Sequence, residues 1–217
     1  SHEKVATIAS WAFSLLPEEV SPIIEIDSAD AYRATDVYLA AEETPIPRKD
    51  FFETWREFLP LLLEDGSIGI GANADDPFVE VFVDQWKTIN IHVPIVMRDI
   101  VEEGLEKFDL HEVPETWAQP DDPQEETATI RPVLDTSQPD YGSLDDLLLE
   151  LKRRWTLELN VDPDRNLDQA GRDLGMTLWN AIVIAEDAAG DDKRGAFISV
   201  WLSARSLTEA EELVLRA

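Results

Sequence analysis

A stretch dense in proline, residues 109–142, divides this chain of 217 residues. It contains five prolines, and it has nine acidic residues against one basic residue, Arg131. Proline fixes φ and removes a backbone donor, so neither a helix nor a strand ladder continues easily through such a segment. We therefore expect an acidic, proline-rich linker or long loop here, between a first α+β unit (residues 1–108) and a second (residues 143–217).

Hydrophobic periodicity predicts the elements of the first unit. A helix is expected from Val5 to Leu16, ended by Pro17, and another over Asp50–Leu63, kinked or ended by Pro60. Ser28–Glu43 fits either a helix or a segment with a strand over Thr35–Ala40. Further strands are expected at Ile23–Ile26 and Ser67–Ala72, and a helix after Pro94.

The clearest prediction is a β-hairpin. Val79, Val81 and Val83 alternate with Glu80 and Asp84, and Ile89, Ile91 and Val93 alternate with Thr88, Asn90 and His92. A three-residue loop, Gln85–Lys87, keeps the apolar residues on one face, because a slip of one residue would move them to the other. It pairs Val83 with Ile89 and places Glu80 across from His92. This loop lacks the glycine that three-residue hairpin loops prefer.

The second unit is predicted to begin with a helix over residues 143–154, capped by Ser143, and a strand over Thr156–Val161. Two strands, Leu178–Glu186 and Ala196–Ala204, and a final helix after Ser206 follow. A single helix over Leu167–Ala189 is the alternative. Gly171 and Gly175 would each cost that helix about 1 kcal/mol relative to Ala, which favours the strand.

The predicted fold class is therefore α+β, with two small units. Each is expected to be an antiparallel sheet, a strand plus a hairpin, packed against helices, in what reads as an αβββα pseudo-repeat. Small modules of this layout occur among bacterial secretion chaperones and regulatory binding domains. This is a likeness of layout that names no family.

The charge of the chain excludes some partners. Asp and Glu total 46 against 18 Lys and Arg, a net charge of -28. Direct nucleic-acid binding needs a basic surface, which this composition does not favour, and anionic membranes repel such a chain. The acids are expected either to keep the protein soluble or to mimic a polyanion toward a basic partner. Their presence in both units and the linker favours solubility.

The chain has no cysteine, which excludes disulfides, thiolate metal sites and cysteine nucleophiles. It also has no 18-residue apolar run, so no membrane insertion is expected. Together these features weigh toward a cytoplasmic protein. Oligomeric state does not follow from them.

One segment has the oxygen spacing of a calcium loop. Asp162, Asp164, Asn166, Asp168 and Asp173 fall at positions one, three, five, seven and twelve. Position six is Leu167, where the turn needs glycine, and Arg165 adds a repelling charge. Calcium is thus the one cofactor worth considering, and an ordinary polar loop is the competing interpretation.

No segment predicts catalytic residues, and no nucleophile motif or cofactor loop is present. Trp86, at the tip of the predicted hairpin, is a candidate contact for a protein partner, because large aromatics are enriched at interfaces. The favoured function is a non-enzymatic protein-binding or regulatory module, similar to a chaperone or adaptor. The alternatives are a carboxylate-based hydrolase, with or without a metal, and a polyanion mimic.

Overall fold

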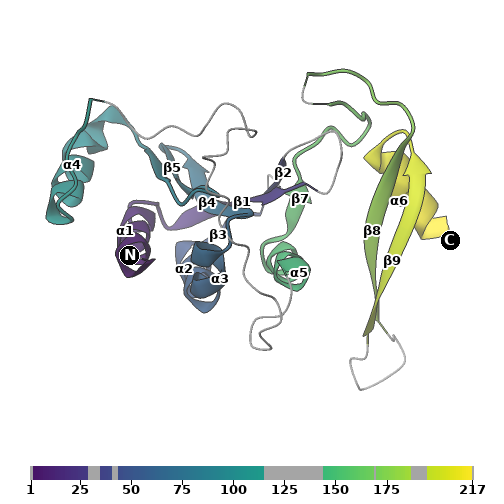
Figure 1. Ribbon diagram of the computed structural model, residues 1–217, viewed down its shortest axis with the longest axis horizontal. Coiled ribbons are helices and arrows are strands. Elements are labelled where there is room, and N and C mark those ends of the chain that lie inside the picture. The colour runs from purple at the N-terminus through teal and green to yellow at the C-terminus, as the bar shows by residue number, and fades with distance from the viewer. Residues whose placement is uncertain are drawn as a thin grey trace, which may run out of the picture. The chain divides into compact units, whose positions relative to one another are not determined.

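The computed structural model describes residues 2–28, 35–40, 44–114, 144–168, 170–186 and 195–216. Two compact units are present (Figure 1). The first consists of Ser1–Ser28 and Thr35–Leu159, and the second includes Asn160–Ala217. Residues 115–142 of the expected linker lie outside the described residues.

The first unit alternates helices with antiparallel strands, as an α+β fold does. Its helices are α1 (His2–Phe13), α2 (Arg48–Glu57), α3 (Leu59–Glu64), the 3-10 turn η1 (Ile95–Met97), α4 (Arg98–Lys107) and α5 (Leu144–Trp155). Its strands are β1 (Glu19–Asp27), β2 (Thr35–Ala40), β3 (Ile46–Pro47), β4 (Ile68–Asp75), β5 (Phe78–Val83), β6 (Ile89–His92) and β7 (Leu157–Leu159). The expected break near Pro60 is the boundary between α2 and α3.

These strands form one sheet in the order β6-β5-β4-β1-β2-β7, and β3 pairs with β1 outside this row. Each neighbouring pair is antiparallel. The open question about Ser28–Glu43 is answered for Thr35–Ala40, which is strand β2. The residues on either side of β2, 29–34 and 41–43, lie outside the described part of the chain.

The predicted hairpin register is confirmed. Val83 pairs with Ile89, Val81 with Ile91, and Glu80 with His92. Lys87 takes the place of the missing glycine, with φ of 62°. The Lys87 ammonium donates to the Ile68 carbonyl at 2.6 Å, and this contact anchors the loop in its left-handed conformation.

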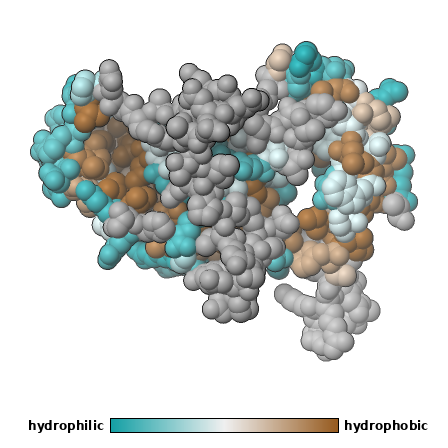
Figure 2. Space-filling model, in the orientation of Figure 1, coloured by the Kyte–Doolittle hydropathy of each residue, from teal (hydrophilic) through white to brown (hydrophobic). Residues whose placement is uncertain are grey.

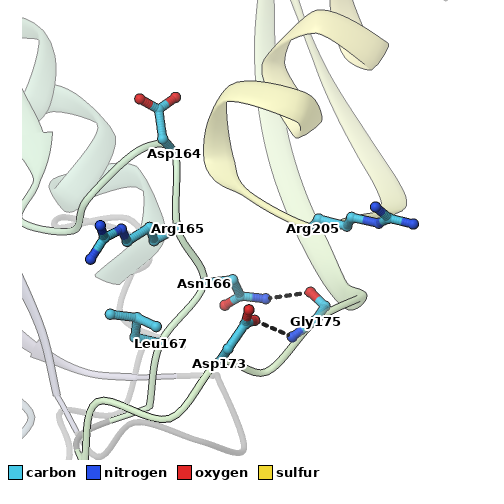
Figure 3. Close-up of a pocket in the computed structure, with 7 residues that line it drawn as sticks. All are labelled: Asp164, Arg165, Asn166, Leu167, Asp173, Gly175 and Arg205. Carbon is cyan, nitrogen blue, oxygen red and sulfur yellow. Dashed lines mark hydrogen bonds between the residues drawn. The ribbon is translucent and has the colours of Figure 1, made fainter.

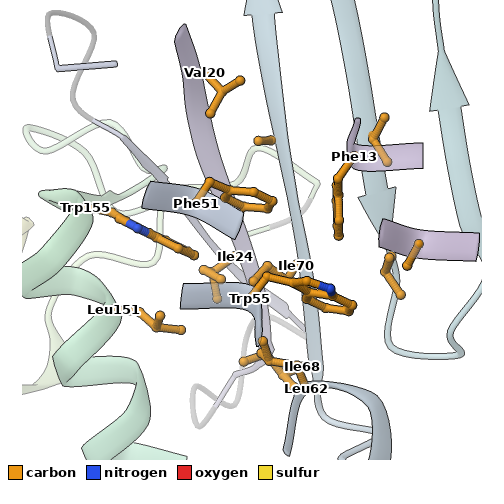
Figure 4. Close-up of a cluster of buried hydrophobic side chains, with 14 of the residues drawn as sticks. Phe13, Val20, Ile24, Phe51, Trp55, Leu62, Ile68, Ile70, Leu151 and Trp155 are labelled. Carbon is orange, nitrogen blue, oxygen red and sulfur yellow. The ribbon is translucent and has the colours of Figure 1, made fainter. Parts of the chain in front are cut away.

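A hydrophobic core lies between the sheet and the helices (Figure 4). Ile24, Ile68 and Ile70 of the sheet are buried under aromatic side chains from the helices. Phe13 of α1 meets Trp55 of α2 edge to face, with ring centroids 5.1 Å apart. Such pairs contribute about 1 kcal/mol beyond their buried area.

One boundary expected from the sequence needs correction, because α5 and β7 belong to the first unit. Leu147, Leu151 and Trp155 of α5 join the hydrophobic core. Strand β7 pairs with β2, with Leu39 opposite Glu158. Proximity along the chain favours the second unit for the apolar face of α5, whereas the larger core of the first unit buries it.

The second unit contains β8 (Thr177–Glu186), β9 (Gly195–Ala204) and α6 (Leu207–Arg216). The preference for a strand over a helix before residue 187 is confirmed. Gly171 and Gly175 have φ of +74° and +64°, which a right-handed helix does not allow. Strands β8 and β9 pair with each other over their whole length. Within the described residues this sheet has two strands, because β7 is part of the other sheet.

Candidate functional site

The loop over Asp162–Asp173, which has calcium-like spacing, uses its carboxylates as caps for its own turns. Asp162 Oδ1 accepts from the Asp164 amide at 3.1 Å. Asp168 Oδ1 accepts from the amides of Ala170 and Arg172 at 2.9 and 2.8 Å. Asp173 Oδ1 accepts from the Gly175 amide at 2.8 Å. Each of these bonds satisfies a backbone donor that a turn leaves unpaired.

Two arginines lie close to these carboxylates. Arg172 Nε donates to Asp168 Oδ2 at 2.6 Å, and Arg165 Nε lies 3.5 Å from Asp162 Oδ2. Hydrogen bonds from the Arg172 amide, followed by its side chain, lower the pKa of the Asp168 carboxyl below its usual value. The loop thus supplies its own positive charges.

Asn166 is the structural centre of this loop. Its side chain is 4% exposed, and Nδ2 donates to the Gly175 carbonyl at 3.2 Å and to Thr177 Oγ1 at 2.5 Å. The amide therefore ties the loop to the start of β8. Thr208 of α6 donates through Oγ1 to Asp164 Oδ1 at 2.9 Å, which ties the same loop to the helix.

The loop borders an open hollow lined by Asp164, Arg165, Asn166, Leu167, Asp173, Gly175 and Arg205. In Figure 3 the side chains of Asp164, Arg165 and Arg205 point away from the hydrogen-bonded pair Asn166 and Gly175. Among the described residues no three acidic or histidine side chains group as a metal site does. Calcium binding stays a prediction, which titration calorimetry with calcium chloride tests. The observed hydrogen bonds favour the structural role.

The most conspicuous surface feature of the second unit is one face of the β8–β9 hairpin. Leu178, Ile182, Phe197 and Trp201 point to this side, and they are 66%, 48%, 67% and 66% exposed. We call these four residues the hairpin face. Figure 2 shows hydrophobic residues gathered over the hairpin. An apolar group of this kind on a small unit is typical of an interaction surface.

The opposite side of the hairpin packs on α6. Trp179 is half-buried there and donates through Nε1 to the Ala204 carbonyl at 3.1 Å. Ala204 and Ala210 are buried between hairpin and helix. Sequence reasoning found both strands but missed the hairpin face. The signal was present, because β8 is apolar at both odd and even positions while one helix follows it.

Trp86 is less exposed than expected. It lies in the loop between β5 and β6 and is half-buried. A partner contact at the tip of the hairpin requires an exposed side chain. Partner binding by Trp86 stays a prediction, and the exposed aromatic residues Phe197 and Trp201 meet that requirement better.

In the first unit, carboxylates gather on the sheet face opposite the core. Glu25 of β1 lies near Glu80 and Asp84. Partial burial, and then repulsion by Asp84 and Glu80, raise the pKa of the Glu25 carboxyl. The hollow described in this unit, beside Arg48, Phe52 and Arg56, is lined by other residues.

Comparison with protein-family models, with curated proteins and with solved structures finds no match to this chain. Within the described residues no helix has both the length and the apolar character needed to cross a bilayer.

Proposed function

We propose that this chain is a non-enzymatic protein-binding or regulatory module, comparable to an adaptor, and that the hairpin face is its contact surface. The observation that carries the proposal is the exposure of two aromatic and two aliphatic side chains on one side of a two-stranded sheet. Aromatic residues dominate the energy of protein interfaces, because they bury a large area with few rotatable bonds.

The test compares three forms of the immobilised chain in extract of the source cells. Wild type is compared with Phe197→Ser on the hairpin face and with Leu215→Ser, a control on α6 at a residue 85% exposed. Proteins retained by wild type and by Leu215→Ser but lost with Phe197→Ser support the proposal. Identical sets of proteins from all three forms contradict it.

Salt separates this proposal from polyanion mimicry. Apolar contacts persist at moderate salt, whereas attraction between acids and a basic partner is screened over about 8 Å at physiological ionic strength. Partners that remain bound at high salt support recognition through the hairpin face. Partners that salt releases from both wild type and Phe197→Ser favour the polyanion mimic.

The second candidate is a carboxylate-based hydrolase, and Glu25 is the observation that favours it. A carboxyl with a raised pKa beside two others is a typical arrangement for general acid catalysis. Binding is favoured over this candidate because these carboxylates line neither of the two hollows described. Hydrolysis of ester, glycoside or phosphate substrates by wild type, lost in Glu25→Gln, would reverse the preference.

A further inference from the structure

The second unit is short of buried apolar side chains. In its described residues, those less than a tenth exposed are Asn166, Ala204, Ser206 and Ala210. The first unit, in contrast, buries a large cluster that includes Trp55, Phe51 and Phe13. An isolated two-stranded hairpin is marginally stable in water, and the apolar residues that this one buries with its single helix are small, Ala204 and Ala210. The second unit therefore needs further apolar contact to fold firmly.

Small units find such support in disulfides, metals or oligomerisation. The chain has no cysteine, so disulfides are excluded. The carboxylates of the Asp162–Asp173 loop serve as caps and arginine partners, as described above. Association through the hairpin face is the route that the observed surface supports directly.

The hairpin face is suited to burial against a neutral, apolar surface. The register places Leu178, Asn180 and Ile182 of β8 on the same side as Ser199, Trp201 and Ser203 of β9, and none of these side chains is charged. Asn180 Nδ2 donates to Ser199 Oγ at 2.9 Å. Because Asn180 and Ser199 already share this hydrogen bond, covering these two groups costs less desolvation free energy than covering unpaired groups.

The absence of charge on these positions is informative in a chain with a net charge of -28. A basic partner is recognised through acids, and these positions offer none. A second copy of the chain presents the same uncharged positions, so stacking two copies over them brings no like charges together at these positions. A twofold contact of this kind needs only one self-complementary patch.

The exposed area of the hairpin face is also of the order that a dimer interface needs. With 150–250 Å² for a whole aromatic side chain, the fractions above leave roughly 500 Å² open on the four residues. Two copies would bury roughly 1,000 Å² in total, near the lower end for specific interfaces. An area at this end of the range is typical of a weak dimer that dissociates on dilution.

We propose that the hairpin face is the interface of a symmetric homodimer, in which it packs against the hairpin face of a second copy. This inference rests on the proposed function, because it names the partner of the same surface. Net charge opposes the approach of two copies at long range. Salt screens this repulsion, so the dimer should form more readily as ionic strength rises.

Sedimentation velocity of the purified chain, across nanomolar to high micromolar concentration, tests the proposal. Wild type should shift from monomer to dimer, and the shift should move to lower concentration when sodium chloride is added. Phe197→Asp should weaken association by at least 30-fold, because it places two like charges in the contact. Leu215→Asp, on α6, adds the same charge elsewhere and should dimerise as wild type does. Far-ultraviolet circular dichroism confirms that both variants are folded.

Because the chain has no native cysteine, a single engineered cysteine can carry a spin label. This second measurement detects the contact directly and does not depend on a variant that weakens association. A spin label on a Ser203→Cys variant, at the edge of the hairpin face, should show dipolar coupling between copies. The same label on a Glu211→Cys variant of α6 should show weaker coupling. Equal coupling at both positions would place the contact elsewhere and overturn the proposal.

The outcomes also separate this inference from the proposed function. A purified chain that stays monomeric at every concentration and salt overturns the homodimer. If Phe197→Ser still loses partners in extract, the binding module survives with a different partner. If a monomeric wild type loses thermal stability with Phe197→Ser and retains no partners, the face is covered within the chain, and both proposals fall.

Discussion

Trp155 stacks on Phe51, with ring centroids 5.4 Å apart and planes 25° from parallel. The contact joins α5 to α2 and places α5 in the core of the first unit. Trp155→Ala should therefore lower the free energy of unfolding of that unit by roughly 3–5 kcal/mol. Urea unfolding followed by circular dichroism measures the loss, and Trp155→Phe should retain much of the stability. A change confined to the second unit would contradict this assignment of α5.

The ring of Phe82 lies over two glycines of β4, Gly69 and Gly71. These two positions should differ in how well they tolerate substitution by alanine. A Cβ at Gly71 would lie 2.5 Å from the Val81 carbonyl oxygen, which is backbone and cannot move aside. A Cβ at Gly69 would meet the ring of Phe82 first, at 2.9 Å. Gly71→Ala should cost about 1–3 kcal/mol, and Gly69→Ala should cost less. Equal midpoints of thermal unfolding would contradict this explanation.

Asn166 should be the most sensitive residue of the Asp162–Asp173 loop. Asn166→Ala leaves Thr177 Oγ1 and the Gly175 carbonyl without their amide donor, which should cost about 1–3 kcal/mol. Asp173→Asn is the control, because its amide oxygen can still accept from the Gly175 amide. Hydrogen exchange at β8 and α6 measures the effect in the second unit. If Asp173→Asn lost more protection from hydrogen exchange than Asn166→Ala did, the structural role of Asn166 would be contradicted.

Because its pKa is raised in the folded protein, Glu25 should lower the stability of the fold by an amount that depends on pH. The folded protein holds the Glu25 proton more tightly than the unfolded chain does, so ionised Glu25 destabilises the fold. At neutral pH, Glu25→Gln should be more stable than wild type, by less than about 1 kcal/mol because solvent screens this half-exposed group. The difference should shrink as pH falls toward the ordinary pKa of 4.5 and below. If the stability difference between Glu25→Gln and wild type instead grew as the pH fell, the predicted direction of the Glu25 pKa shift would be wrong.

The acidic composition predicts stabilisation by salt. Between about 0.01 M and about 0.15 M sodium chloride the Debye length falls from about 30 Å to about 8 Å, which weakens repulsion among the charges. The midpoint of thermal unfolding should rise over this range, also in the Phe197→Asp variant, in which dimerisation should be weakened. A flat or falling midpoint in both forms would promote polyanion mimicry over solubility as the purpose of the charge.

Local pattern was sufficient for most elements of this fold. The spacing of Val79, Val81 and Val83, with Glu80 between the first two, predicted the register of β5 and β6, because one slip would bury Glu80. The glycines at 171 and 175 excluded a continuous helix, since their backbone takes positive φ. The α+β class follows from these short-range preferences, which act within a few residues.

Long-range packing decided the rest. The sequence by itself determined that residues 144–155 form an amphipathic helix, but not which core buries Leu151 and Trp155. Likewise, β8 is apolar on both faces, so the sequence could not show which apolar face of the hairpin α6 covers and which, with Phe197 and Trp201, stays open. Periodicity specifies that a face is apolar, whereas its neighbour is chosen by the available buried area across the whole chain. The candidate site belongs to this second kind of information, which only the tertiary structure contains.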